Sequence, residues 1–103
     1  MVKILITEFL NNNSLKKLEK VFKVHYDEKL WKYPKNIIKI IKDFDCLIVR
    51  NKTKVNKNLL YEANKIKLIG RLGVGLDNID TKYCNSKKIY IQPATGMNAD
   101  SVA

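Results

Sequence analysis

Arginine is rare in this sequence, although basic residues are abundant. Of the 20 lysine and arginine residues in the 103-residue chain, only Arg50 and Arg71 are arginine. The guanidinium group is planar and permanently charged, and it can hold a carboxylate or a phosphate through two parallel hydrogen bonds, which lysine cannot copy. Because lysine serves at every other basic position, we interpret the two arginines as candidate anion-binding residues.

A glycine-rich stretch, GRLGVGLDNID, covers residues 70–80. Gly73 and Gly75 allow positive φ values and leave successive backbone N–H groups free to point into a concave anion site. Asp77 and Asn78 are predicted to cap the next helix, whose N-terminus would add partial positive charge. A small carboxylate is the natural ligand of such a loop. The alternative interpretation is a tight turn between a strand and a helix, with both arginines on the surface.

Particular residues exclude other kinds of functional site. The G-x-G-x-x-G dinucleotide-binding motif would need a third glycine at Asn78 and an acidic residue at the end of the next strand, where Gln92 and Pro93 stand. A phospho-accepting receiver domain would need an aspartate in place of Arg50, and a flavodoxin would need a glycine-rich loop after the first strand. His25 has no nucleophile in its context and is interpreted as structural. The sequence contains no metal-ligand spacing.

Strand and helix patterns alternate along the chain. Short apolar runs predict buried strands, and apolar residues at helical spacing predict amphipathic helices. Asparagine and serine precede the first helix, Pro34 begins the second and Asn56 caps the third. The predicted strands are residues 3–7, 23–27, 46–50, 66–73 and 89–93, and the predicted helices are residues 11–22, 34–44, 55–65 and 77–88.

This alternation determines the expected fold class. Strands that alternate with helices through short loops imply right-handed crossovers and a parallel sheet covered on both faces. Five strands in a chain of this length predict an α/β fold of the doubly wound, flavodoxin-like kind, with strand order 2-1-3-4-5. Such sheets bind ligands outside the carboxyl ends of their strands, near the switch point between strands 1 and 3. Arg50 and Arg71 end the third and fourth strands, so both are expected at this edge.

The composition limits the classes of partner. A net charge of +10 at neutral pH raises nucleic-acid binding as an alternative, but the lysines are spread along the chain without a basic block. We therefore expect a solvated basic surface or an acidic small-molecule substrate, and no nucleic acid. No apolar run approaches the ~20 residues that span a membrane, and the N-terminus does not resemble a secretory signal, so a cytoplasmic protein is expected. Cys46 and Cys84 are interpreted as reduced, packed thiols.

A family resemblance covers the second half of the chain, in the segments LIVRNKTKVN, LLYEANKIKLIGRLGVGLDNID and IYIQPATGMNADSVA. These segments closely resemble the N-terminal half-domain of the D-isomer-specific 2-hydroxyacid dehydrogenases, strongly over residues 46–103 and only in pattern over residues 1–45. In that family a flavodoxin-like substrate domain is interrupted by a Rossmann domain that binds NAD. The resemblance implies that residues 1–103 form the substrate-binding half-domain and end at the junction to the NAD-binding domain.

The resemblance also implies roles for residues in the glycine loop and near the C-terminus. The N–H groups of Val74 and Gly75 would hold the substrate carboxylate, and Val74 would also lie near the nicotinamide end of NAD. Asn98 matches a polar residue near the substrate at the domain junction.

The two arginines also match positions of the family. Arg71 corresponds to a residue that can contact the substrate acid, and Arg50 and Asn51 correspond to the end of the third strand, which lines the cleft in phosphoglycerate-type members. Two arginines and a basic surface favour a 2-hydroxy acid with a second anion, such as 3-phosphoglycerate or sulfolactate.

The catalytic arginine, acidic residue and histidine of the family, together with its NAD-binding glycine motif, would lie beyond residue 103. The resemblance therefore assigns no catalytic residue to this chain, and the 103 residues alone are expected to be inactive as a dehydrogenase and to expose apolar surface where the remaining parts pack. The complete enzyme would be a homodimer. The alternative is a non-enzymatic binding module of the same superfamily, similar to its NAD-sensing corepressors.

Overall fold

The computed structural model of the chain describes residues 2–73 and 77–93, and in them strands and helices alternate as predicted. A short 3-10 helix, η1, precedes the second α-helix. The elements are β1 (Lys3–Ile6), α1 (Asn12–Val21), β2 (Lys23–Tyr26), η1 (Leu30–Lys32), α2 (Pro34–Ile41), β3 (Cys46–Val49), α3 (Lys57–Leu60), β4 (Leu68–Arg71), α4 (Thr81–Ser86) and β5 (Tyr90–Pro93).

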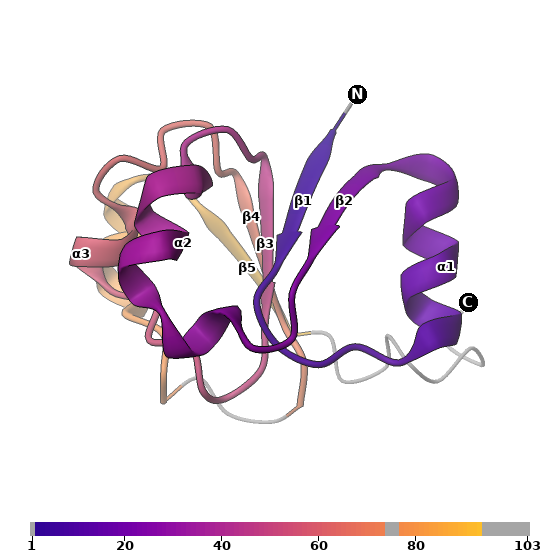
Figure 1. Cartoon of the computed structure of the whole chain (residues 1–103). Helices are drawn as coiled ribbons and strands as arrows, with labels where there is room; N and C mark the ends of the chain where they lie inside the picture. Colours follow the sequence, from indigo (N-terminus) through magenta and orange to yellow (C-terminus); the bar gives the residue numbers. More distant parts are fainter. Residues whose placement is uncertain (1, 74–76, 94–103) are drawn as a thin grey trace.

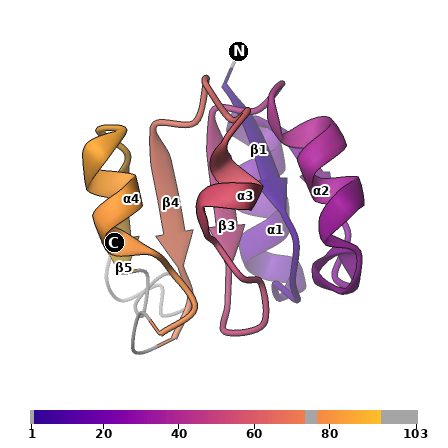
Figure 2. The same ribbon diagram turned by 90° about the vertical axis from the view of Figure 1, so that its left-hand side faces the viewer.

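The five strands form one parallel sheet in the order β2-β1-β3-β4-β5, which confirms the predicted flavodoxin-like fold. All four residues of the central strand β3 are buried, as expected for a parallel strand covered on both faces. Helices α2, α3 and α4 cover one face of the sheet, and α1 covers the other (Figures 1 and 2).

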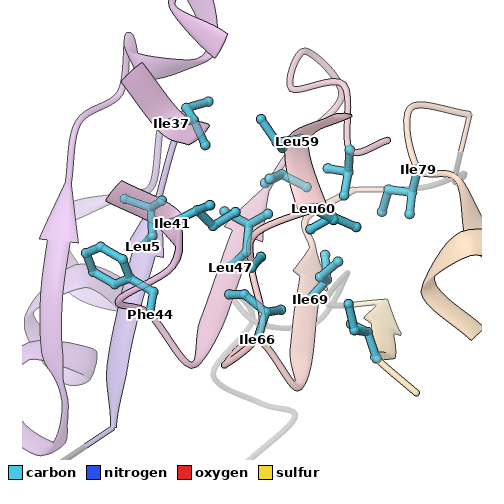
Figure 3. Packing of buried hydrophobic residues seen from close by; sticks show 14 of the residues in the cluster. Leu5, Ile37, Ile41, Phe44, Leu47, Leu59, Leu60, Ile66, Ile69 and Ile79 are labelled. Atoms are coloured by element: carbon cyan, nitrogen blue, oxygen red, sulfur yellow. The ribbon is translucent and has the colours of Figure 1, made fainter. Parts of the chain in front are cut away.

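Two hydrophobic clusters lie on opposite faces of the sheet. The larger cluster fills the space between the sheet and helices α2, α3 and α4, and its members point toward one another in Figure 3. The smaller cluster joins β1 and β3 to α1 and β2. Fully burying one such aliphatic side chain contributes roughly 1.5–3 kcal/mol. The fully buried members of the larger cluster include Leu5, Ile37, Ile41, Leu47, Leu60 and Ile69.

All four helices are shorter than predicted: α1 loses one residue at each end, α2 ends at Ile41 rather than at residue 44, and the third and fourth helices differ most. The third helix is a single turn after its predicted cap, Asn56, whose side chain accepts a hydrogen bond from the N–H of Leu59 at 3.0 Å. The predicted capping of the fourth helix by Asp77 and Asn78 is wrong, because α4 begins at Thr81 and its N-cap is Asp80.

The late start of α4 has a tertiary cause. Val55 and Ile79 form an isolated parallel bridge, in which the N–H of Val55 donates to the Asn78 carbonyl and the N–H of Asp80 donates to the Val55 carbonyl, both at 2.8 Å. This pairing holds the backbone extended where the sequence predicts the first helical turn. The anion site therefore gains no helix N-terminus at Asp77.

Alanine substitution at each candidate cap tests whether Asp77 or Asp80 begins α4. The Asp80 carboxylate accepts the N–H of Tyr83 at 3.0 Å, so Asp80→Ala should lower the free energy of unfolding by about 1 kcal/mol. Asp77→Ala removes an exposed carboxylate before the helix and should change stability by less than about 0.5 kcal/mol. Urea denaturation of both variants measures the difference, and equal losses would contradict the assignment of the cap.

Both cysteines are buried and free, which confirms that they are packed thiols. Burial, with a smaller contribution from the Asp45 carboxylate, raises the pKa of Cys46 to about 11. The pKa of Cys84 is also raised, first by burial and then by Asp80. Such thiols are poor nucleophiles near neutral pH, so neither is a candidate catalytic residue.

The raised pKa of Cys46 makes stability depend on alkaline pH. The ordinary thiol pKa is 9.0, so the unfolded chain loses this proton at a lower pH than the folded chain does. The contribution of Cys46 is therefore complete below pH 9 and is lost as the pH rises toward 11. Between pH 9 and pH 10 this loss should be about 1 kcal/mol. Urea denaturation across this range should show a shallower decline for Cys46→Ala than for the wild type, and parallel curves would contradict the burial effect.

Residues 2–73 and 77–93 contain neither a candidate metal site nor a candidate membrane span. There is no group of three or more His, Cys, Asp or Glu side chains that could hold a metal ion. No helix in this part of the chain has the length and apolar character needed to cross a membrane.

Candidate functional site

Both arginines lie at the carboxyl edge of the sheet, as predicted. Val49 of β3 pairs with Arg71 of β4, and the N–H of Leu72 donates to the Val49 carbonyl at 2.8 Å. Arg50 and the exposed Asn51 follow β3 directly. The sheet register therefore brings the predicted strand-3 and strand-4 site residues to neighbouring strand ends.

The side chain of Arg50 is anchored at one point. Its Nε donates to the Phe9 carbonyl at 2.7 Å, and its Cζ lies 5.7 Å from the centroid of the Phe9 ring. Within the described part of the chain, no hydrogen bond occupies the two terminal nitrogens of this half-buried guanidinium. These nitrogens can donate in parallel to a carboxylate, phosphate or sulfonate.

The turn after β3 is organised by Glu8, which follows β1 and is only 3% exposed. Glu8 Oε2 accepts the N–H groups of Arg50 at 2.9 Å and Thr53 at 2.8 Å. The N–H of Lys52 lies 3.0 Å from Oε1 and 3.2 Å from Oε2. Glu8 is not among the residues that the sequence predicts for the site, although an acidic residue directly after a buried strand at the switch point is a usable signal.

Asn78 joins the same turn to β4. Its Nδ2 donates to the Arg50 carbonyl at 2.8 Å and to the Thr53 carbonyl at 2.7 Å. Its Oδ1 accepts from Arg71 Nε at 3.1 Å. With 8% exposure, Asn78 is a buried bridge between the turn after β3 and Arg71 of β4.

Arg71 is not a surface residue, so the alternative of two surface arginines is wrong for this position. Its side chain is 5% exposed, and besides the bond to Asn78 its Nη1 donates to the Leu72 carbonyl. The role of Arg71 in binding a substrate acid stays a prediction.

Gly73 has the positive φ that the sequence predicts, at 96°. A Cβ atom at this position would lie 3.0 Å from Arg71 Nη1, so both the backbone conformation and the close approach of the arginine favour glycine. Val74, Gly75 and Asn98 lie outside the described residues.

A pocket of about 290 Å³ adjoins Arg50 at the carboxyl edge of β1 and β3. Trp31 forms part of its wall. The centroid of its ring lies 4.7 Å from Lys52 Nζ and 5.6 Å from Lys32 Nζ. Cationic side chains outnumber carboxylates in this wall, so the pocket favours an anion. The lining residues are Glu8, Phe9, Glu28, Lys29, Trp31, Lys32, Arg50, Asn51 and Lys52.

The turn after β3 does not offer the donors that the pyrophosphate of a dinucleotide needs. A pyrophosphate site needs backbone N–H groups that are free to donate, but the N–H groups of Arg50, Lys52 and Thr53 already donate to the Glu8 carboxylate. The arrangement can bind and orient a small anion through Arg50.

Comparison with known proteins identifies relatives across the whole chain. The catalytic domain of the D-isomer specific 2-hydroxyacid dehydrogenases matches residues 4–103. The D-3-phosphoglycerate dehydrogenase of Methanocaldococcus jannaschii is 42% identical over 103 residues, which cover 100% of this chain and 19% of the relative. The (S)-sulfolactate dehydrogenase of Chromohalobacter salexigens is 39% identical over 103 residues, which cover 100% of this chain and 33% of the relative.

Solved structures share the fold. The NAD+-bound 3-phosphoglycerate dehydrogenase of Entamoeba histolytica has a TM-score of 0.70 at 30% identity, over 87% of this chain and 32% of that chain. A protein from Pyrococcus horikoshii has a TM-score of 0.86 at 25% identity, over 99% of this chain and 30% of that chain. The chain thus spans a minor part of the length of these relatives. On the match over residues 4–103, this chain belongs to the family of D-isomer specific 2-hydroxyacid dehydrogenases, within their catalytic domain.

Proposed function

We propose that residues 1–103 form the substrate-binding half-domain of an NAD-dependent D-2-hydroxyacid dehydrogenase. The substrate would be a small 2-hydroxy or 2-oxo acid with a second anionic group, such as 3-phosphoglycerate or sulfolactate. Family membership supports the reaction class, and relatives named as phosphoglycerate and sulfolactate dehydrogenases support an acidic substrate.

The observation that carries the proposal is the state of the Arg50 side chain. Its Nε is fixed on the Phe9 carbonyl, while its terminal nitrogens have no hydrogen bond to a described residue and the side chain lines a pocket rich in lysine. A guanidinium held at one point loses little conformational freedom when it binds an anion. We therefore assign Arg50 and Asn51 to the second anion of the substrate.

The remaining roles follow from the resemblance. The N–H groups of Val74 and Gly75 would hold the carboxylate at C2, with Arg71 and Asn98 beside the substrate and Val74 also near the nicotinamide. By the same resemblance, NAD would be bound mainly by a further domain, and the complete enzyme would act as a cytoplasmic homodimer. The 103 residues alone would be inactive.

Turnover assays on the intact polypeptide that carries this chain test the proposal. We expect NADH-dependent reduction of 3-phosphohydroxypyruvate or sulfopyruvate, with a kcat/KM at least about tenfold above that for glyoxylate, which has no second anion. Arg50→Lys keeps the charge but loses the fork, so it should reduce this preference. Lys35→Ala, a change of an exposed lysine on α2, should not. If no 2-oxo acid is reduced with NADH or NADPH, the enzyme assignment fails and a binding module is the better reading.

A further inference from the structure

The pocket around Arg50 contains a buried carboxylate that anion binding alone does not explain. Glu8 lines the same pocket as Arg50, and a negative charge there opposes the binding of an anion. Yet Glu8 is 3% exposed, and its carboxylate accepts hydrogen bonds from three backbone N–H groups of the 50–53 turn. A carboxylate kept at an anion-binding edge needs a compensating role.

We propose that Glu8 is a positioning residue, which holds the turn after β3 so that Arg50 presents its guanidinium fork to the second anion of the substrate. This inference rests on the function proposed above. Glu8 itself does not touch the substrate, and its effect on binding passes through Arg50.

The geometry ties both ends of Arg50 to the residues that follow β1. The backbone N–H of Arg50 donates to Glu8 Oε2 at 2.9 Å, and its side-chain Nε donates to the carbonyl of the next residue, Phe9, at 2.7 Å. Hydrogen bonds to a charged acceptor are roughly twice as strong as neutral ones. The position of the Arg50 fork is thus set by the end of β1, a buried strand of the sheet.

Glu8 and Asn78 hold different backbone groups of the 50–53 turn. Glu8 takes up the N–H groups of Lys52 and Thr53, whereas Asn78 satisfies the carbonyls of Arg50 and Thr53. A neutral glutamine at position 8 would keep one acceptor oxygen but would place an NH2 group against one of the N–H donors. Glu8→Gln should therefore shift the turn while the sheet stays intact.

Positioning and simple electrostatics predict opposite results. Removing a negative charge beside an anion site should lower KM if charge alone matters, but should raise KM if Glu8 positions Arg50. Glu28 provides the matched control, because it is an exposed carboxylate that lines the same pocket and has no hydrogen bond to a described residue. Glu28→Gln changes the charge without changing the turn.

The experiment compares Glu8→Gln, Glu28→Gln, Arg50→Ala and the Glu8→Gln/Arg50→Ala double variant in the intact polypeptide. With 3-phosphohydroxypyruvate or sulfopyruvate, Glu8→Gln should raise KM by about tenfold with little change in kcat. Both constants for glyoxylate should stay near the wild-type values, and Glu28→Gln should leave KM unchanged or lower it. In the Arg50→Ala background, Glu8→Gln should add no further increase. The conservative Glu8→Asp keeps the charge and should give a smaller increase in KM. It also replaces Glu8→Gln in the comparison if the glutamine variant does not fold.

Three outcomes would overturn the inference. They are an equal effect of Glu8→Gln and Glu28→Gln, equal losses of kcat for all substrates, and additive effects of Glu8→Gln and Arg50→Ala. Equal losses of kcat would show a merely structural role, and additive effects would show that Glu8 does not act through Arg50.

A second readout keeps this test separate from the proposed function. In an NMR spectrum, the Arg50 Nε–H signal, assigned by its loss in Arg50→Ala, should be protected from solvent exchange in the wild type and exposed in Glu8→Gln. If the wild type reduces no 2-oxo acid, the proposed function fails, and this signal still decides whether Glu8 positions Arg50. Unchanged protection in Glu8→Gln would overturn the positioning role.

Discussion

Replacing Asn78 by alanine should lower the free energy of unfolding by about 2–4 kcal/mol. The change removes two donors to the Arg50 and Thr53 carbonyls and one acceptor from Arg71 Nε, all in a site that is 8% exposed. The cost arises because buried polar partners lose their hydrogen bonds while water has little access. Urea denaturation monitored by circular dichroism measures the loss.

Two further variants serve as controls for the loss of the Asn78 side chain. Asn85→Ala removes an exposed asparagine from α4 and should change stability by less than about 0.5 kcal/mol. Asn78→Asp keeps an acceptor for Arg71 but sets a carboxylate oxygen against two carbonyls, so it should be destabilising as well. If Asn78→Ala were as stable as Asn85→Ala, the bridge from the turn after β3 to Arg71 would contribute nothing to folding.

Replacing Arg71 by lysine should lower kcat/KM for dianionic 2-oxo acids by about 10- to 100-fold, since hydrogen bonds to charged groups contribute about 1.5–3 kcal/mol. Lysine keeps the charge, but one ammonium group cannot replace both the Nε donor to Asn78 and the Nη1 donor to the Leu72 carbonyl. The assay uses the intact polypeptide at a temperature where denaturation curves show the variant to be folded.

The stability of Arg71→Lys shows whether its lower kcat/KM comes from a weakened loop or from a lost contact with the substrate. A buried arginine that only supports the loop would lose stability on substitution and recover kcat/KM at low temperature, whereas a substrate-binding arginine would keep the kinetic defect when fully folded. Arg50→Lys is the matched control, because Arg50 is half-buried and its replacement should affect binding more than stability. An unchanged kcat/KM for Arg71→Lys across several acidic substrates would remove Arg71 from the site.

The sheet could be predicted from the sequence because its information is local. Each strand is a short apolar run, and each crossover carries apolar residues at helical spacing, so the alternation alone leaves few parallel topologies. The same reasoning places Arg50 and Arg71 at one edge, since residues that end parallel strands must lie together. The positive φ of Gly73 is likewise a local property of a glycine in a tight turn.

The buried polar network could not be predicted in this way. Asp77 and Asp80 are equally good caps by residue type, and only the pairing of Val55 with Ile79 selects Asp80. That pairing joins segments far apart in the chain, and so do the contacts of Glu8 with the 50–53 turn. Asn78 has the appearance of a helix cap in the sequence, and its role as a buried bridge depends on three partners from other segments.

The way Glu8 and Asn78 hold the 50–53 turn has a consequence for how the site can change in evolution. Both residues contact only backbone N–H and carbonyl groups of the turn, so these hydrogen bonds do not depend on the side chains of Asn51 and Lys52. Thr53 differs, because its buried hydroxyl lies 2.7 Å from that of Thr7. Asn51 and Lys52 can be exchanged for other residue types without loss of these bonds, and proline is excluded at position 52 because it has no N–H. The side chains at these two positions can therefore diversify while the backbone of the turn, and with it the stability of the domain, is retained.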